Sequence, residues 1–224
     1  MKKLLTLVLL LGTALLYAQD TVYYLKPDFK IIEKNINNKS SNFYYEKLFN
    51  RYSKGDATLT MEEKQHLYFG YSFKEEYNPY YTSDSIQVIR TLINTDNLSK
   101  KDMQRVLALT TEALKGYPFD LSLMGYRSFF LRELGKDKEA AAEGVRADII
   151  LDAILSTGDG TTKQTCLYTI SVGNEYEIIN ILGLTFGGTQ KFIDTKYDYL
   201  SIKENDQGIT GLYFDVSRIM ASFK

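Results

Sequence analysis

The sequence predicts an α+β fold in which a helical N-terminal half packs on a small, mostly antiparallel C-terminal sheet. Up to residue 157, apolar residues recur at three- and four-residue spacings, and helix-capping residues precede several of these runs. Beyond Gly158 and Gly160 the pattern changes to the alternation that is typical of strands. We therefore expect a helical region over 19–157 and a sheet region over 158–224. Because three or four short strands bury too little surface alone, we expect one cooperative unit.

The first helices follow from local start and stop signals. Two helices are expected near 27–36 and 42–53, with a loop rich in Asn and Ser between them. Thr60 and Glu63 have the spacing of a capping box, in which each side chain satisfies a free backbone N–H group of the other residue. A helix is therefore expected directly after Thr60. Continued past residue 70, it places four ring-bearing side chains on one stripe: His66, Phe69, Phe73 and Tyr77.

Three further helices are predicted between residues 99 and 157. Ser99 begins the first of them, and Gly116 provides its stop signal. The next is expected over 121–134, with Gly135 directly after it. The last begins at Asp137 and is expected to bury four residues on one face: Ala142, Val145, Ile149 and Ala153.

The C-terminal region contains the predicted strands. Residues 165–172 alternate between two faces, which predicts a strand. A short helix capped by Asn174 is expected over 174–182, although its Ile and Tyr content leaves a strand open. Strands near 190–203 and 209–216 are joined by the polar turn 204–208. Finally, Ser217 is placed to cap a last helical turn.

The first eighteen residues have the composition of a secretory signal peptide. Lys2 and Lys3 precede an apolar run from Leu4 to Leu16, and Ala18 supplies the small residue at a cleavage site. The apolar run is thirteen residues long, shorter than the about 18 that a membrane-spanning helix requires. No Cys follows it to carry a lipid anchor. We expect cleavage of 1–18, a periplasmic or secreted location, and no membrane span in the mature chain.

Charge and composition exclude several classes of function. The chain has 27 Lys and Arg against 28 Asp and Glu, so it has no excess positive charge to attract nucleic acid. With one His and one Cys, a single copy cannot build a Cys- or His-type zinc site or a structural disulfide. The Gly-rich segments 158–163 and 187–191 lack the spacing of a phosphate-binding loop. We predict no metal, no cofactor and no identifiable catalytic residue.

Two stretches resemble a tetratricopeptide repeat. The run Ala113–Asp120 is similar to the closing segment of that repeat, and Leu134–Ala140 is similar to its inter-helix turn. The likeness covers one good repeat and a degenerate second one over 61–116, fewer than an independent solenoid requires. It implies an antiparallel helix pair with a concave face that other elements cap.

Two longer segments resemble a known family. Tyr52–Tyr81 and Gly208–Met220 are similar to the signature segments of a secreted bacterial family known as a domain of unknown function, number 4919. The resemblance covers essentially the whole mature chain. It implies the architecture and a secreted location, and it brings no activity, substrate or catalytic residue.

The densest concentration of aromatic residues defines the candidate site. Residues 43–81 hold twelve of the thirty Tyr and Phe residues. Amphipathic tyrosines can line a cleft for a peptide or a sugar, and the same rings can equally fill an ordinary core. His66 fits a general base or a packed core residue, and Cys166 fits an inert buried thiol better than a nucleophile. The candidate binding residues are His66, Phe73, Glu76, Tyr77, Tyr80 and Tyr81.

Three functions remain after these exclusions. The leading hypothesis is a non-enzymatic binding or scaffold protein of the cell envelope, whose helical groove and tyrosine segment bind a protein or peptide. The alternative is a glycan or small-ligand binding protein that uses the same segment. The third is a hydrolase, for which the sequence pairs no carboxylates. Neighbouring acids such as Glu62 and Glu63 point about 100° apart on a helix and cannot face each other across a substrate.

Overall fold

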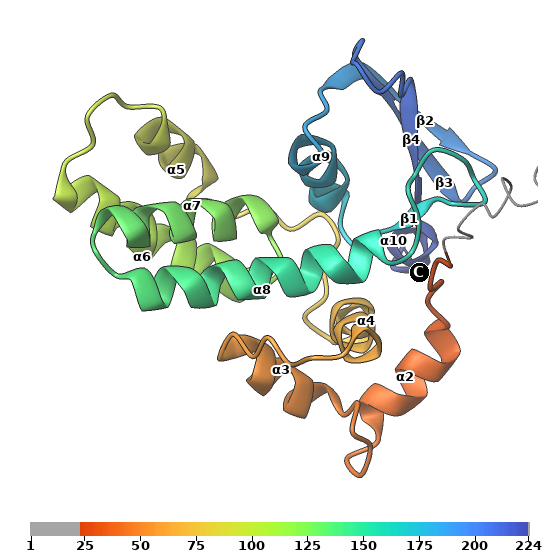
Figure 1. The fold of residues 1–224 in the computed structure, drawn as a ribbon. Helices are drawn as coiled ribbons and strands as arrows, with labels where there is room; N and C mark the ends of the chain where they lie inside the picture. Colours follow the sequence, from red (N-terminus) through yellow and green to blue (C-terminus); the bar gives the residue numbers. More distant parts are fainter. Residues whose placement is uncertain (1–22, 224) are drawn as a thin grey trace, which may run out of the picture.

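The computed structural model describes residues 23–223 and confirms the α+β fold. Figure 1 shows helices from α2 to α8 forming the first part of the chain, with the sheet at the other end. The helical part consists of α2 (Phe29–Asn37), α3 (Tyr45–Ser53), α4 (Met61–Gly70), the 3-10 helix η2 (Tyr71–Phe73), α5 (Ile86–Ile93), α6 (Lys100–Gly116), α7 (Leu121–Glu133) and α8 (Asp137–Leu155).

The helix starts follow the capping signals of the sequence. Thr60 and Glu63 form the predicted capping box at the start of α4, and the Ser99 side chain accepts from the Asp102 N–H at the start of α6. Asp120 caps α7 in the same way through the Leu123 N–H. These local bonds satisfy backbone donors that a helix end otherwise leaves free, so they fix where each helix begins.

Helix α8 is the central element of the helical half. It packs against α7, α4 and α3, and its C-terminal end reaches β1, as Figure 1 shows. The prediction that Ile149 and Ala153 are buried is confirmed, whereas Ala142 and Val145 are only partly buried. That turn instead buries Glu143, because its carboxylate pairs with the guanidinium groups of Arg127, at 3.0 Å, and Arg146.

The sheet has four strands in the order β1-β4-β3-β2. The pair β1–β4 is parallel and the other two pairs are antiparallel, so the sheet is mostly antiparallel as predicted. The strands are β1 (Leu167–Tyr168), β2 (Phe186–Ile193), β3 (Tyr197–Ile202) and β4 (Gly211–Asp215).

Two strand predictions were wrong in extent. Within 165–172 only Leu167 and Tyr168 join the sheet, because residues on both sides of this segment are buried and the alternation does not mark one exposed face. The segment 190–203 is a hairpin and not a single strand. It turns at Asp194 and Thr195, whose φ angles are 52° and 53°. Hairpin turns of this type usually carry Asn and Gly, so Asp194 and Thr195 form no clear turn signal.

Helix α9 (Val172–Ile181) lies between α7 and the sheet, as Figure 1 shows, and α10 (Ser217–Ala221) ends the described chain. The expected helix over 174–182 is therefore confirmed, but its cap is not Asn174. The helix begins two residues earlier, which places Asn174 in the first turn and fully buries it. Its side chain bonds to the helical half of the molecule instead of capping its own helix.

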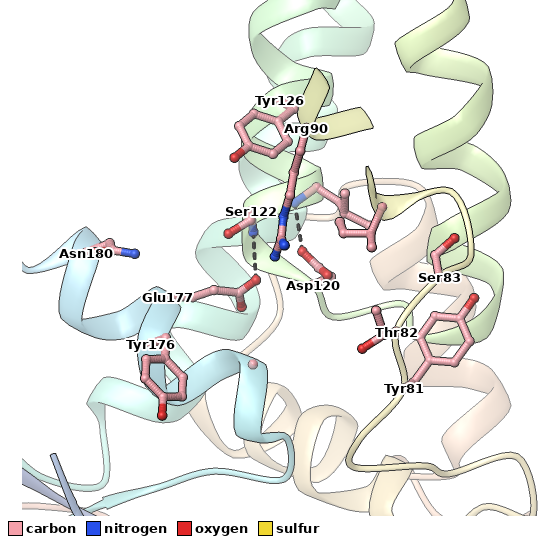
Figure 2. A pocket seen from close by; sticks show the side chains of 13 residues that line it. Tyr81, Thr82, Ser83, Arg90, Asp120, Ser122, Tyr126, Tyr176, Glu177 and Asn180 are labelled. Atoms are coloured by element: carbon pink, nitrogen blue, oxygen red, sulfur yellow. Dashed lines mark hydrogen bonds between the residues drawn. The ribbon is translucent and has the colours of Figure 1, made fainter. Parts of the chain in front are cut away.

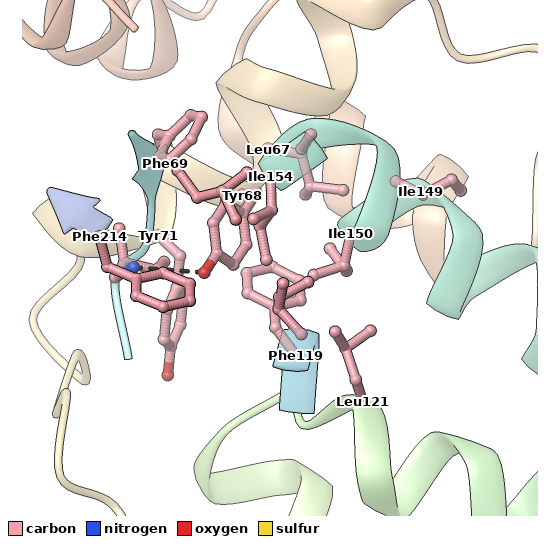
Figure 3. Close-up of a cluster of buried hydrophobic side chains, with 14 of the residues drawn as sticks. Leu67, Tyr68, Phe69, Tyr71, Phe119, Leu121, Ile149, Ile150, Ile154 and Phe214 are labelled. Atoms are coloured by element: carbon pink, nitrogen blue, oxygen red, sulfur yellow. Dashed lines mark hydrogen bonds between the residues drawn. The ribbon is translucent and has the colours of Figure 1, made fainter. Parts of the chain in front are cut away.

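One large core joins the helices to the sheet. Figure 3 shows Tyr68, Phe69 and Phe119 packed with Ile154 of α8 and Phe214 of β4. A smaller cluster under α5, α6 and α7 includes Ile89, Val106 and Phe130. Among the aromatic residues of 43–81, five are buried in the large core and therefore fill it: Tyr45, Tyr52, Tyr68, Phe69 and Tyr71.

The shared core supports the prediction of one cooperative unit. Residues of the helical half and residues of the sheet bury each other in a single cluster, so neither half can unfold without exposing the core of the other. We expect differential scanning calorimetry of the mature chain to give one transition whose calorimetric and van't Hoff enthalpies agree. Two separated transitions would contradict this expectation.

Within residues 23–223, no helix combines the length and the apolar character that crossing a bilayer requires.

Candidate functional site

The residues predicted to line a tyrosine cleft do not form one site. Helix α4 ends at Gly70 and the chain turns at η2, so the predicted single stripe through Phe69, Phe73 and Tyr77 is wrong. The turn brings consecutive aromatic rings to different faces of the core.

His66 is a core residue. It is 4% exposed, and its ring stacks on Phe43 with the ring centres 4.1 Å apart. Nδ1 lies 2.8 Å from the Glu62 carbonyl oxygen, which only accepts, so Nδ1 carries the proton. Nε2 then accepts from the Asn35 side-chain amide at 3.1 Å. Because both ring nitrogens are engaged, His66 is held as a packed residue.

Phe73 and Tyr77 connect the helical half to the C-terminal half. The Arg218 guanidinium lies 4.0 Å from the centre of the Phe73 ring, and the Tyr77 hydroxyl donates to the Ile170 carbonyl oxygen at 2.7 Å. Both side chains are partly buried by these contacts. Their positions indicate a role in holding the two halves together.

Three of the candidate residues are at the surface. Tyr80 is 51% exposed and its ring packs on Phe223, with the ring centres 5.4 Å apart. Tyr81 is also exposed and lines the pocket described next, whereas Glu76 is exposed and lines a different cleft. Of the predicted residues, Tyr81 and Glu76 are therefore the two that border a cavity.

A polar pocket of about 360 Å³ lies between α5, α7, α9 and the segment 81–83, and Figure 2 shows its lining. Its aromatic walls come from Tyr81, Tyr126 and Tyr176. Neutral hydrogen-bonding groups come from Thr82, Ser83, Ser122 and Asn180, and the charged groups are Arg90, Asp120 and Glu177. The volume fits a small molecule of about the size of a sugar or a disaccharide.

A pair of carboxyl groups lies at the start of α7. Glu177 accepts from the Leu121 and Ser122 N–H groups at 3.2 and 3.1 Å and from the Asn174 side-chain amide at 2.7 Å. Burial first, and then the charge and hydrogen bonding of Asp120, raise the pKa of Glu177 to about 8. Glu177 therefore keeps its proton near neutral pH, and we call Glu177 and Asp120 the acid pair.

Arg90 supplies the positive charge of the pocket. It projects from α5 toward the start of α7, as Figure 2 shows, and its side chain is exposed. No ion pair of Arg90 occurs within the described residues, so its guanidinium donors are available to a ligand. One positive guanidinium and an acid pair that holds one proton give the pocket no net charge near pH 7.

A second pair of acids lies on the opposite side of α9. Glu175 is fully buried, and neither of its carboxyl oxygens has a hydrogen-bond donor within the described chain. Burial raises its pKa well above the usual value, and Asp198 of β3 raises it further. The pKa of Asp198 is also raised by burial, while the Gln190 amide, 2.6 Å away, lowers it. Helix α9 is therefore flanked by acids on both faces.

The exposed surface beside α3 contains a second opening. A cleft of about 440 Å³ lies between α3, η2 and the C-terminal end of α6. We call it the aromatic cleft. Its lining includes Tyr45, Phe49, Tyr71, Glu76, Leu114 and Pro118.

Neither the lone thiol nor a metal cluster offers a reactive centre. Cys166 is buried, and burial raises the pKa of its thiol to about 11, which keeps it protonated at neutral pH. Within 23–223, no three His, Cys, Asp or Glu side chains are placed to hold a metal ion together.

Sequence reasoning missed most of the polar pocket. It did not select Arg90, Tyr126 or Tyr176, nor either member of the acid pair. One signal was available in α9, where Glu175 and Glu177 lie among apolar residues that include Val172, Ile178 and Ile179. Acids at such positions are expensive to bury, so they often mark sites at which function overrides stability.

The fold is an α+β domain, and its polar pocket lies between the helical half and helix α9. A comparison with protein families finds that residues 30–224 match the model of a domain of unknown function, DUF4919, and the chain belongs to this family. Among curated proteins and among solved structures, nothing matches the chain.

Proposed function

We propose that this protein is a binding protein of the cell envelope that captures a small, neutral, hydroxyl-rich molecule, a saccharide, in the polar pocket. The observation that carries the proposal is the pocket itself, where Arg90 and the acid pair balance in charge among tyrosine walls. A site without net charge favours a neutral ligand over an anion or a cation.

The chemistry of the lining supports this ligand class. Sugars present flat C–H faces and hydroxyl groups, so they pack on amphipathic rings and need both donors and acceptors. Tyr126 and Tyr176 offer ring faces, Arg90 offers donors, and Asp120 offers an acceptor. Ser122 and Asn180 add hydroxyl and amide groups that suit a neutral ligand.

Binding is favoured over hydrolysis by the way in which the acids are held. Glycoside hydrolases place their two carboxyl groups about 5 Å or more apart, so that the scissile bond lies between them. Here both carboxyl groups are engaged by the start of α7, where Asp120 accepts from the Leu123 N–H and Glu177 accepts from the Leu121 and Ser122 N–H groups. This arrangement fixes the pair as one acceptor surface.

The proposal includes a location and a relation to repeat proteins. The signal peptide predicted over 1–18 lies outside the described residues, and it supports export to the periplasm or beyond. The likeness of 113–140 to a tetratricopeptide repeat supports a second candidate, recognition of a protein or peptide by the helical half. The observation that favours this candidate is the aromatic cleft, which is separate from the polar pocket.

We expect a neutral mono- or disaccharide to raise the melting temperature of mature protein in a thermal-shift panel, with calorimetry then giving its affinity. Arg90→Ala and Tyr126→Ala should each weaken binding about 10- to 100-fold, the loss expected for a charge-assisted hydrogen bond or a stacked ring. Matched controls are Arg105→Ala and Tyr23→Ala, since both residues are exposed outside the pocket. No response to any neutral saccharide, or equal affinity in all four variants, would refute the proposal.

A further inference from the structure

One face of α9 lines the polar pocket over most of the length of the helix. Residues at spacings of three and four positions contribute to the lining: Gly173, Tyr176, Glu177 and Asn180. Because this spacing places residues on one side of a helix, they form a row along the pocket wall. Figure 2 shows Tyr176, Glu177 and Asn180 along α9. The other side of the helix carries its buried residues, so the row is the part of α9 that a ligand can reach.

The walls of the pocket are longer than one sugar ring. Seven positions separate Gly173 from Asn180, which corresponds to about 10 Å along a helix. On the wall that α7 provides, the lining residues run from Asp120 to Tyr126, and these six positions correspond to about 9 Å. A ligand that contacts both ends of either wall therefore has about the length of two linked sugar rings.

Gly173 leaves one end of the α9 wall without a side chain. Its φ angle lies outside the left-handed region that favours glycine. A Cβ atom at this position would lie 3.5 Å from Ser171 Oγ, which is ordinary van der Waals contact. Neither the backbone nor the packing requires glycine here, and glycine lowers helix stability relative to alanine. Because Gly173 is exposed and lines the pocket, the absent side chain leaves space for a ligand.

The side chains beside this space are held in place by the fold. The Tyr176 hydroxyl donates to Gln190 Oε1 at 2.8 Å, and the Tyr176 ring packs edge-on against Phe186, with the ring centres 5.2 Å apart. Glu177 is held by backbone N–H groups at the start of α7. Neither side chain can turn into the space at Gly173 without losing these contacts. The space is therefore present before a ligand binds.

From these observations we propose that the polar pocket has two subsites along α9 and that its ligand is a neutral disaccharide. One sugar ring lies against the bare backbone at Gly173, and the other lies at the end formed by Glu177 and Asn180. Gly173 determines the length of the ligand, because a larger residue there would occupy the space of one ring. The inference rests on the proposed function, since it specifies which saccharides the same pocket binds.

The test compares monosaccharides with disaccharides built from them. Isothermal titration calorimetry of the mature chain would use glucose with maltose and cellobiose, and galactose with lactose. We expect at least one disaccharide to bind about 10-fold or more tightly than its monosaccharides, the gain that one further set of contacts provides. In isotopically labelled protein, that disaccharide should shift the Gly173 amide resonance, whereas its monosaccharides at saturation should shift it less.

Gly173→Leu fills the second subsite. It should lower the affinity for the disaccharide about 10-fold, to the level of the monosaccharide, and leave the affinity for the monosaccharide within about twofold. Gly173→Ala should weaken disaccharide binding by a smaller factor. Neither variant should lower the melting temperature, because alanine and leucine both favour helix more than glycine does. Gly125→Leu, at an exposed position of α7 outside the pocket lining, is the matched control and should leave both affinities unchanged.

The outcomes separate this inference from the proposed function. Monosaccharides that bind as tightly as their disaccharides, or an unchanged disaccharide affinity in Gly173→Leu, would overturn the second subsite and leave the saccharide pocket standing. If none of the sugars bound to the wild-type protein, the proposed function would be wrong and this inference with it.

Discussion

We expect Glu175→Gln to stabilise the protein increasingly as the pH rises from 5 to 8. Glu175 is fully buried, and its pKa is raised well above the usual value by burial first and by Asp198 second. The folded state therefore retains a proton that the unfolded chain releases above about pH 4.5. Gln keeps the shape and the donor of the protonated acid, and it has no proton to lose.

The direction of the effect follows from proton linkage. Between the unfolded and the folded pKa of Glu175 the native state binds more protons than the unfolded state, so the free energy of unfolding falls as pH rises. The stabilisation is fully present below about pH 4.5 and is lost as pH rises toward the folded pKa. Each pH unit in that window is worth about 1.4 kcal/mol for one group. Asp198, the acid facing Glu175, contributes in the same direction.

Urea unfolding at pH 5, 6.5 and 8 measures this effect. We expect the difference in the free energy of unfolding between Glu175→Gln and wild type to be smallest at pH 5 and to grow at each higher pH, by at most about 1.4 kcal/mol per pH unit. Glu133→Gln, at an exposed position on α7, is the matched control and should follow wild type at every pH. A constant difference between Glu175→Gln and wild type would show that Glu175 ionises normally in the native protein.

We expect Asn174→Ala to lower the free energy of unfolding by about 3–5 kcal/mol, because it breaks a buried hydrogen-bond network. The Asn174 Oδ1 accepts from the hydroxyls of Tyr68 and Tyr117 at 2.8 and 2.7 Å, and its Nδ2 donates to the Phe119 carbonyl at 3.0 Å. Its Nδ2 also donates to Glu177 Oε2 at 2.7 Å, so alanine leaves four partners without this group. The network connects α9 to the helical half, so its loss weakens the contact between the two halves.

A double-mutant comparison identifies the source of this loss. In a Tyr68→Phe, Tyr117→Phe background the two hydroxyls are absent, so Asn174→Ala should cost clearly less than in wild type. Asn50→Ala, at an exposed position on α3, is the control and should change stability by less than about 0.5 kcal/mol. A loss below about 1 kcal/mol for Asn174→Ala in wild type would refute the role of the network.

The two predictions concern the same helix and have a common basis. On α9, Glu175 faces Asp198 of the sheet and Glu177 faces Asp120 of α7, while Asn174 links the helix to the large core. The buried acids lower the free energy of unfolding at neutral pH, and the fully hydrogen-bonded amide of Asn174 offsets this loss. The polar pocket opens beside this helix, so its acid pair is held where a ligand can reach it.

Some of the architecture could be predicted from local sequence alone. The start of α4 follows from Thr60 and Glu63, and the start of α6 follows from Ser99, because capping bonds form between residues only three positions apart. The α+β class also follows from a local pattern. Near Gly158 the apolar residues change from helical spacing to the alternation of strands. In contrast, the hairpin at Asp194 was missed, because two residues without glycine adopt left-handed backbone angles there.

The sequence by itself determined the α+β class, most of the helices, the family resemblance and the exclusion of zinc and disulfide chemistry, but not helix α5 or the β2–β3 hairpin. Only the tertiary structure decided which aromatic rings are core and which line a cavity, since burial depends on contacts between residues far apart in the chain. Arg90, Asp120 and Glu177 meet in one pocket although up to 87 positions separate them. Likewise, the pKa of Glu177 is raised because folding buries its carboxyl group and places it beside Asp120.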